Sequence, residues 1–377
     1  MTTTAYEEST SEVLAAASEM ARPETAASAP ITGTRFDQLN LAVRKALISC
    51  GVWLLYVPHL TLILVLGPWL GLRWTRLVAW AHWLLTFLGA QRELHRVLTR
   101  LYPTFDTDLS VRTLIRKNLE LKHQSFAEWR LATTRRGRRY IKKTYQTFDY
   151  HRQYVANLDT SHGALVLSYH YGMYKLLGVG LSTCYGFDYH QIDFRSAHYS
   201  TSALGPIARL AFRNAIKTAE GTGTKFIFLG PESSPLGIVK RLRKGGILAI
   251  AGDGMISSEF TEVPFLGETL RLPTGWARLA ALTRVPVVIM FATMEGIDRR
   301  NLVVLPPLYC EDNTDEAVHN FVARCAETLE DFVRRRPWAW HIWHRMKLNE
   351  DRDGHLHLRV DPVVTDAERV HSETSSS

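Results

Sequence analysis

Residues 164–182 read ALVLSYHYGMYKLLGVGLS, and this stretch decides the fold class. It begins with a short apolar run that ends in polar residues, and Gly172 allows a tight turn into the segment that follows. An apolar run of this length is typical of a strand that is buried on both faces of a sheet. The stretch therefore predicts a strand, a turn and a helix, which together form one unit of an α/β fold.

Three further apolar runs of the same kind occur downstream, at 225–230, 247–253 and 286–293. Helical patterns lie between the runs, at 202–217, 235–246 and 274–284. This alternation predicts a mixed, mostly parallel central sheet that is flanked by helices. Ligands of such sheets bind beyond the C-terminal ends of the strands. His170 and Asp253 stand at two of these ends, so they are the first candidates for site residues.

The composition of the chain fits a folded protein with such a core. Of its 377 residues, 46% are hydrophobic and 22% are charged. These proportions exclude a disordered chain, a collagen-like chain and a membrane protein with many spans. The 45 Lys and Arg residues outnumber the 37 Asp and Glu residues, which gives a formal net charge of +8. A positive charge favours anionic partners, namely lipid headgroups, phosphorylated carriers or nucleic acid.

Several common site types are absent from the sequence. The four cysteines are widely scattered: Cys50, Cys184, Cys310 and Cys325. Their spacing predicts neither a disulfide framework nor a zinc site. The sequence also has no glycine-rich phosphate loop and no Gly-x-Ser-x-Gly elbow. Nucleotide-binding, zinc-dependent and serine-hydrolase functions therefore have no support.

We expect four regions along the chain. Residues 1–33 are rich in Ala, Ser, Thr and Glu, so they predict a disordered tail. Residues 34–100 predict an apolar helical region that associates with a membrane, and residues 101–360 predict the α/β domain. Residues 361–377 predict a second loose tail.

An apolar block at residues 46–72 contains no Asp, Glu, Lys or Arg, and basic residues flank it on both sides. The block is long enough to cross a bilayer, but Pro58, Gly67 and Pro68 interrupt it. A second apolar segment at 77–90 is too short to span. Three interpretations stay open: an interfacial or re-entrant anchor, a spanning helix, and a buried core hairpin. Two adjacent apolar segments flanked by Arg favour contact with a membrane.

A cluster of basic residues follows a helical pattern at 111–131. Its members are Arg135, Arg136, Arg138, Arg139, Lys142 and Lys143. One interpretation is a solvated helix face. The other is a patch that attracts phosphate groups of a lipid, a carrier or RNA.

Five segments carry a resemblance to a known family: YHYGMYK at 169–175, LRKGGILAIAGDG at 242–254, VPFLGET at 263–269, TGWARLAALTRVPVV at 274–288 and LEDFVRRRPWAWHIWHR at 329–345. In this order they resemble the bacterial lipid A biosynthesis lauroyl/myristoyl acyltransferase family, of the lysophospholipid-acyltransferase-like superfamily. The resemblance runs from about residue 36 to residue 347. Family members have an apolar anchor and a His-x4-Asp/Glu motif, usually His-Phe-Gly-Asn-Trp-Glu. His170 and Gly172 stand in register with that motif.

The resemblance implies an acyltransferase without a cofactor. His170 would remove a proton from the acceptor, which attacks an acyl thioester on an acyl carrier protein or coenzyme A. The motif acid would orient the imidazole and stabilise the imidazolium. Candidates for substrate contact are Tyr171, Gly172, Lys175, Arg213 and Glu259.

The chain has Lys175 where the family has its motif acid. A cation cannot stabilise an imidazolium, and it weakens a neighbouring histidine as a base. Three explanations stay open. Another acid takes the role, and of Asp188, Asp193, Asp253 and Glu259 we expect Asp253, at a strand end, to be the best placed. Alternatively, the nucleophile is an amine or hydroxylamine, which needs less help from a base, or the chain is a non-catalytic binder.

We therefore expect a membrane-associated acyltransferase that acts on a hydroxyl or an amine. Its expected location is the cytoplasmic face of the inner membrane, where a peripheral contact or a single anchor would hold it to an anionic surface. The first alternative is transfer from an aminoacyl-tRNA to a small amine in secondary metabolism. The second alternative is a lipid-binding pseudoenzyme.

Overall fold

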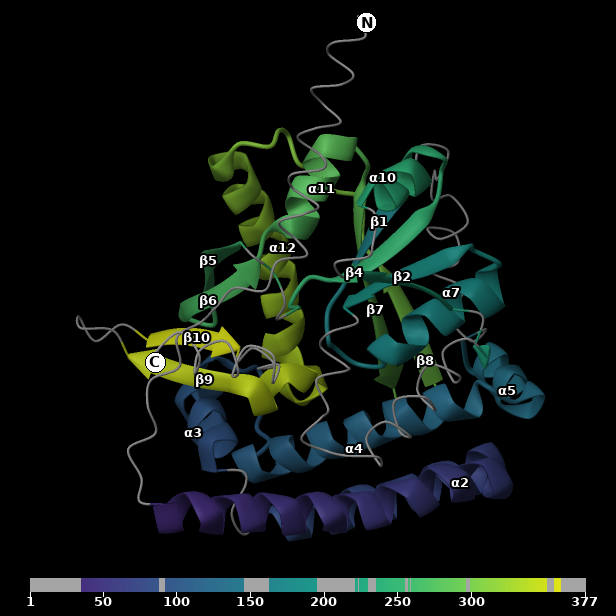
Figure 1. The fold of residues 1–377 in the computed structure, drawn as a ribbon, viewed down its shortest axis with the longest axis vertical. Helices are drawn as coiled ribbons and strands as arrows, with labels where there is room; N and C mark the ends of the chain where they lie inside the picture. The colour runs from purple at the N-terminus through teal and green to yellow at the C-terminus, as the bar shows by residue number, and fades with distance from the viewer. Residues whose placement is uncertain are drawn as a thin grey trace, which may run out of the picture.

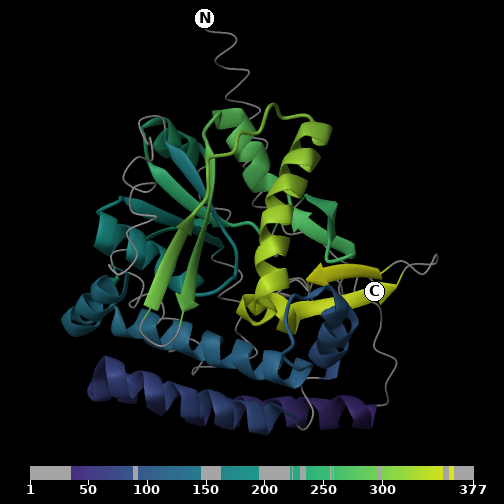
Figure 2. The same cartoon turned by 180° about the vertical axis from the view of Figure 1, so that it is seen from behind.

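The computed structural model describes residues 35–87, 92–145, 163–194, 221–222, 224–229, 235–254, 257, 259–295, 299–350 and 356–360. Both predicted tails lie outside the described residues, as do Arg213 and the predicted helix at 202–217. The described part has a central α/β layer, a smaller sheet beside it, and long helices that cross one end of both (Figures 1 and 2).

The central sheet has six strands in the order β3-β2-β4-β1-β7-β8. They are β1 (Ala164–Ser168), β2 (Tyr189–Phe194), β3 (Lys225–Leu229), β4 (Ile247–Ala251), β7 (Val287–Glu295) and β8 (Arg299–Val304). All neighbouring pairs are parallel except β7 and β8. The prediction of a mixed, mostly parallel central sheet is confirmed. The strands at its centre are continuous apolar runs because both of their faces are covered.

Helices α7 (Leu177–Tyr185), α10 (Pro235–Arg243) and α11 (Gly275–Thr283) lie in the connections between these strands, and α12 (Asp315–Arg335) follows β8. Short 3-10 turns precede α7 and follow α12: η2 (Tyr174–Leu176), η4 (Pro337–Ala339) and η5 (His341–Arg345). In Figure 2, α12 stands between the central sheet and the smaller one.

The smaller sheet has the strand order β5-β6-β10-β9 and was not predicted from the sequence. Its strands are β5 (Phe260–Phe265), β6 (Glu268–Pro273), β9 (Met346–Glu350) and β10 (Leu356–Val360). The turn between β5 and β6 consists of Leu266 and Gly267, both with positive φ. That conformation matches the twist of a two-residue hairpin. Strand β10 pairs with β6 from far along the chain, a contact that local patterns do not reveal.

Three helices form the end layer together with a long apolar helix. They are α3 (Arg92–Leu101), α4 (Val111–Leu131) and α5 (Arg135–Tyr145), with a 3-10 turn, η1 (Tyr102–Thr104), after α3. Helix α4 crosses beneath the central sheet in Figure 1. The Asn118 amide of α4 donates to the carbonyl oxygens of Trp338 and Trp340, each at 2.8 Å. A fully buried ion pair between Glu128 of α4 and Arg300 of β8 makes a second connection.

The apolar helix α2 (Arg35–Phe87) is two helical arms joined at Gly67, where φ is 74° and ψ is −179°. A Cβ placed on Gly71 would lie 3.1 Å from the carbonyl oxygen of Ile63. In a straight helix, eight residues would separate these positions by about 12 Å. The chain therefore reverses at Gly67 and Pro68, and the arms lie against each other. The predicted interruption of the apolar block is confirmed, and its form is a hairpin.

The hairpin has one covered face and one bare face. Ile63 and Leu72 pack against Ala127 of α4 in a small apolar core of their own. On the opposite side, large apolar side chains are exposed to solvent: Leu62, Val65, Leu66, Trp69, Leu70, Trp74, Leu77, Trp80 and Leu84. We call these nine residues the apolar stripe. Figures 1 and 2 show α2 as the outermost layer, lengthwise along α4.

Candidate active site

His170 follows the C-terminal end of β1, and Asp253 follows the C-terminal end of β4. The two strands are adjacent and parallel, and Ser168 pairs with Ala251. Each candidate therefore lies two residues beyond the paired ends, at the same edge of the sheet. The structure brings the two side chains together: the His170 Nδ1 is 2.8 Å from Oδ1 of Asp253.

Asp253 has a fully buried side chain that accepts hydrogen bonds from three groups. They are the His170 ring, the His170 backbone N–H at 3.0 and 3.1 Å, and the Trp340 indole N–H at 2.8 Å. These donors occupy both carboxylate oxygens, so the carboxylate is held in one orientation.

The imidazole is held in the tautomer that a base requires. An ionised carboxylate only accepts hydrogen bonds, so the Nδ1 of His170 carries the proton. The lone pair then lies on Nε2, on the side of the ring away from Asp253. The His170 side chain is 28% exposed, whereas Asp253 is fully buried. This is the arrangement of a general base with an acid behind it that orients the ring.

The turn after His170 requires glycine at position 172. Gly172 has a φ of +63°, and a Cβ there would lie 2.3 Å from the carbonyl oxygen of Ala292. Its N–H donates to the carbonyl of Ala339 at 2.7 Å. The turn is thereby fixed between β7 and the segment after α12. Gly172 thus shapes the backbone next to His170.

Lys175 lies on η2, and its ammonium group is surrounded by aromatic rings. Its ammonium nitrogen is 4.5 Å from the ring of Phe126 and 4.9 Å from that of Trp129, both on α4. It also lies 5.1 Å from the ring of Tyr174. The aromatic faces stabilise the cation without a carboxylate. Asp253, and not the residue at the motif position, contacts the imidazole.

Tyr171, another of the predicted substrate contacts, is buried in the core, where its hydroxyl donates to the Phe332 carbonyl at 2.9 Å. Burial raises the pKa of this phenol. Asp188, one of the alternative acids, pairs with Lys225 at the N-terminal end of β3, whereas His170 and Asp253 follow the C-terminal ends of their strands.

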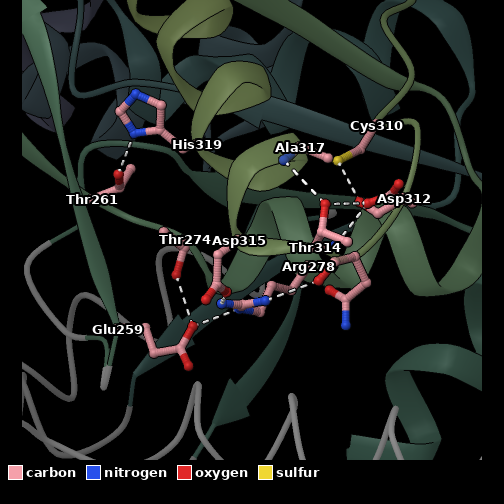
Figure 3. A network of polar contacts seen from close by, with 11 residues as sticks. Glu259, Thr261, Thr274, Arg278, Cys310, Asp312, Thr314, Asp315, Ala317 and His319 are labelled. Atoms are coloured by element: carbon pink, nitrogen blue, oxygen red, sulfur yellow. Dashed lines mark hydrogen bonds and ion pairs between the residues drawn. The ribbon is translucent and has the colours of Figure 1, made fainter.

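Glu259 belongs to a polar network that Figure 3 shows in close view. Its carboxylate accepts from the guanidinium of Arg278 at 2.5 Å and from Thr274 at 3.2 Å. Arg278 also donates to Asp315, at the start of α12. The network connects the segment before β5 to α11 and α12. The structure places Glu259 in this connection, and its contact with substrate stays a prediction.

Two residues of the site were missed by the sequence analysis. Trp340 donates to Asp253, and His341 donates from its backbone N–H to the carbonyl of His170 at 2.7 Å. Burial lowers the pKa of the His341 imidazole to about 3, which keeps it neutral and unsuited to serve as the base. Both residues lie within the aromatic segment 329–345. The density of tryptophans in that segment was the available signal, but only the fold shows which tryptophan reaches Asp253.

Metal ligands are not grouped in the described part of the chain. No set of three or more His, Cys, Asp or Glu side chains there could hold a metal ion. No disulfide joins Cys184, Cys310 and Cys325 in the part of the chain that the structure describes.

Comparison with known proteins assigns the chain to a family. The family model of the bacterial lipid A biosynthesis acyltransferases matches residues 41–347. No individual curated protein matches the chain. The match covers the apolar hairpin, the central sheet, the His170–Asp253 pair and the aromatic segment after α12. The chain therefore belongs to the bacterial lipid A biosynthesis acyltransferase family, and it is an acyltransferase.

Proposed function

We propose that the protein transfers an acyl group from a thioester to a hydroxyl or an amine, with His170 as the general base. The Nε2 of His170 takes the proton from the acceptor as its oxygen or nitrogen attacks the thioester carbonyl carbon. The tetrahedral intermediate collapses, the carbon–sulfur bond breaks, and the imidazolium returns the proton to the leaving thiolate. Asp253 stabilises the imidazolium between these two transfers.

The single observation that carries this proposal is the bond between the His170 Nδ1 and Asp253 at 2.8 Å, with the carboxylate fully buried. A base and its orienting acid are both in place, which argues against a pseudoenzyme. The family supports an acyl carrier protein or coenzyme A as the carrier of the donor. Neither carrier requires a covalent intermediate on the enzyme.

The second part of the proposal is that the hairpin lies in the plane of a membrane surface. Residues Pro58–Leu84 are long and apolar enough to cross a membrane. However, the chain reverses at Gly67, and one face of the hairpin is packed against α4, which is rich in charged residues. A helix that is surrounded by lipid cannot make such a contact. The apolar stripe supports an interfacial anchor, with three tryptophans at headgroup depth.

The basic helix α5 supports an anionic membrane partner. Five of its basic side chains are exposed: Arg135, Arg136, Arg139, Lys142 and Lys143. The Arg136 guanidinium lies beside the hairpin tip, 3.5 Å from the position that a Cβ on Gly67 would take. The basic patch is thus continuous with the apolar stripe, as expected for a surface that binds anionic headgroups. Because acyl carrier and coenzyme A thioesters are cytoplasmic, we place this surface on the cytoplasmic face of the inner membrane.

The alternative with an aminoacyl-tRNA donor and a small amine acceptor loses its two original reasons. The missing motif acid suggested an amine acceptor, but in our proposal Asp253 supplies that acid. The position of α5 beside the hairpin accounts for its positive charge through contact with a membrane. No described contact favours tRNA over an acyl thioester, so this alternative stays a prediction from the sequence.

The test compares donors with one acceptor, 2-aminoethanol, which offers both an amine and a hydroxyl. We expect dodecanoyl-acyl carrier protein or dodecanoyl-coenzyme A to yield an acylated product that mass spectrometry detects as the amide or the ester. His170→Ala should abolish its formation. Transfer from a charged tRNA alone, with affinity falling steeply as salt rises, would contradict the proposal.

A further inference from the structure

The buried Asn118 side chain connects helix α4 to the backbone of Trp340. Its amide nitrogen donates to the carbonyl oxygens of Trp338 and Trp340, each at 2.8 Å, so both of its N–H groups are used. A rotated amide would place its own oxygen against these two carbonyl oxygens, so the contacts fix the orientation of the amide. Asn118 therefore holds the backbone that carries the Trp340 side chain.

The indole of Trp340 is held by packing and directed at one acceptor. It is fully buried, and its ring lies 5.1 Å from the ring of Phe265 and 4.8 Å from that of Trp343. Its N–H donates to Oδ2 of Asp253 at 2.8 Å. The direction of this donor is thus set by groups other than the carboxylate that accepts it.

The indole N–H decides how the Asp253 carboxylate is rotated. The backbone N–H of His170 lies 3.1 Å from Oδ1 and 3.0 Å from Oδ2, so it favours neither oxygen. The last torsion of an aspartate is soft, and one shared donor does not fix it. The indole holds Oδ2 and leaves Oδ1 for the Nδ1 of His170, at 2.8 Å. Loss of the indole donor would deprive a buried carboxylate oxygen of a hydrogen bond, which favours rotation away from the imidazole.

We propose that Trp340 and Asn118 are positioning residues of the acyl transfer, which act on the imidazole of His170 through Asp253. Asn118 holds the backbone of Trp340, the indole holds the carboxylate, and the carboxylate holds the imidazole. This inference rests on the proposed function and adds the residues that keep its base in the required tautomer. Both side chains are buried, so their loss should lower kcat and leave KM unchanged.

The first experiment separates the indole N–H from the bulk of the indole, in dodecanoyl transfer from coenzyme A to 2-aminoethanol. Trp340→Phe keeps an aromatic ring and removes the donor. Trp340→His loses the fused ring but can keep an N–H at the place of the indole nitrogen. We expect Trp340→Phe to lower kcat about tenfold or more, with KM within about twofold, and Trp340→His to keep a kcat about threefold higher than that of Trp340→Phe. A parent-like kcat for Trp340→Phe, or a lower kcat for Trp340→His, would overturn the proposal.

Trp276→Phe is the matched control for the truncation of an indole. Trp276 on α11 is also buried, and its ring packs against that of Phe321 at 5.8 Å. The control should lower the free energy of unfolding, as Trp340→Phe does, but keep kcat within about twofold of the parent. A fall in kcat as large as that of Trp340→Phe would mean that loss of packing alone explains both.

A double-variant cycle tests whether Trp340 acts through Asp253. When Asp253→Asn is already present, the addition of Trp340→Phe should lower kcat by less than about threefold, because the carboxylate that the indole orients is gone. The same loss in both backgrounds would show that Trp340 acts independently of Asp253, which contradicts the proposal.

Nitrogen NMR of the His170 imidazole distinguishes failure of this inference from failure of the proposed function. At a pH where the ring is neutral, the parent should carry its proton on Nδ1, and Trp340→Phe and Asn118→Leu should show more of the Nε2 tautomer. Asn118→Leu leaves the indole in place, so it tests the inference even if the Trp340 variants do not fold. Parent-like tautomers in these variants would overturn the positioning role. Acyl transfer that survives His170→Ala would instead disprove the proposed base, and the tautomers would still report on the positioning.

Discussion

The imidazole of His170 is positioned by four residues from three segments of the chain. Asp253 comes from the end of β4 and Trp340 from the segment after α12, while Gly172 and Tyr174 belong to the turn that follows His170. Asp253 fixes the tautomer of the imidazole, and Trp340 fixes the orientation of the Asp253 carboxylate. Gly172 shapes the backbone next to His170, and Tyr174 contacts the ring. At this scale, single substitutions give distinct results.

Replacement of Gly172 tests how tightly the turn is fixed. Gly172→Ala should lower the free energy of unfolding by more than about 2 kcal/mol, because its Cβ would strike the Ala292 carbonyl and its φ is positive. Gly186→Ala is the matched control, since Gly186 also has a positive φ but nothing within 4 Å. We expect the control to cost about 1 kcal/mol in a chemical denaturation measurement. Equal losses would show that the turn has room for a side chain.

Lys122 gives a prediction for the dependence of stability on pH. Its pKa is about 8 in the fold against 10.5 as the ordinary value. Between these two values the unfolded chain binds more protons, so this residue makes stability rise with pH; below about pH 8 its full destabilising effect is present. Lys122→Met should therefore raise the free energy of unfolding at pH 7 by about 1 kcal/mol, because water still reaches part of the side chain.

The measurement for Lys122 is the difference in unfolding free energy between parent and variant at several pH values. The difference should shrink as pH rises from about 8 toward 10.5. A difference that stays constant over this range would mean that Lys122 keeps its ordinary pKa. Lys240→Met, an exposed lysine on α10, corrects for the loss of a surface charge.

At the scale of elements, α4 connects the apolar hairpin to the candidate site. Ala127 packs against the hairpin, while Phe126 and Trp129 surround Lys175 and Asn118 holds the backbone at Trp338 and Trp340. Helix α4 therefore contacts both the hairpin, which is the proposed membrane-binding element, and the candidate site. If the hairpin lies in a membrane surface as proposed, α4 would hold the site close to that membrane, where a lipid acceptor would be available.

Substitutions in the apolar stripe test the proposed binding to a membrane. Val65 and Leu77 are 75% and 60% exposed, so a charge there should not disturb the fold. The double variant Val65→Glu, Leu77→Glu should bind at least tenfold more weakly to vesicles of equal parts phosphatidylglycerol and phosphatidylethanolamine, measured by sedimentation, because each loses about 1.5–3 kcal/mol of apolar burial.

The matched control for the stripe is Leu236→Glu. Leu236 is exposed on α10, outside the hairpin, so its replacement should leave vesicle binding unchanged. Retention of binding by the double variant would contradict an in-plane anchor. Equal weakening by the control would mean that added negative charge alone repels the anionic vesicles.

At the scale of the whole molecule, the sequence predicted the central sheet because its strands are local apolar runs. It also predicted that His170 and Asp253 lie at the same edge of the central sheet, because the C-terminal ends of parallel strands meet at one edge. The smaller sheet was missed, since β10 reaches β6 from far along the chain. The aromatic surroundings of Lys175 come from α4, about fifty residues earlier, so no local pattern indicated them.

The partner of the positive charge could be proposed only once the fold was known. The excess of basic residues allowed lipid, carrier or RNA as a partner. The structure places the basic patch of α5 beside the hairpin tip, where it supports the proposed contact with an anionic membrane surface.

The most direct test of the central claim is the kcat of Asp253→Asn for dodecanoyl transfer from coenzyme A to 2-aminoethanol. An asparagine amide can donate to the Nδ1 of His170, which moves the imidazole proton to the Nε2 that must act as the base. The account predicts a fall of about 10³-fold or more. Asp315→Asn, an exposed aspartate on α12, should leave kcat unchanged. A kcat for Asp253→Asn within tenfold of the parent would contradict the assignment of Asp253 as the acid that orients His170.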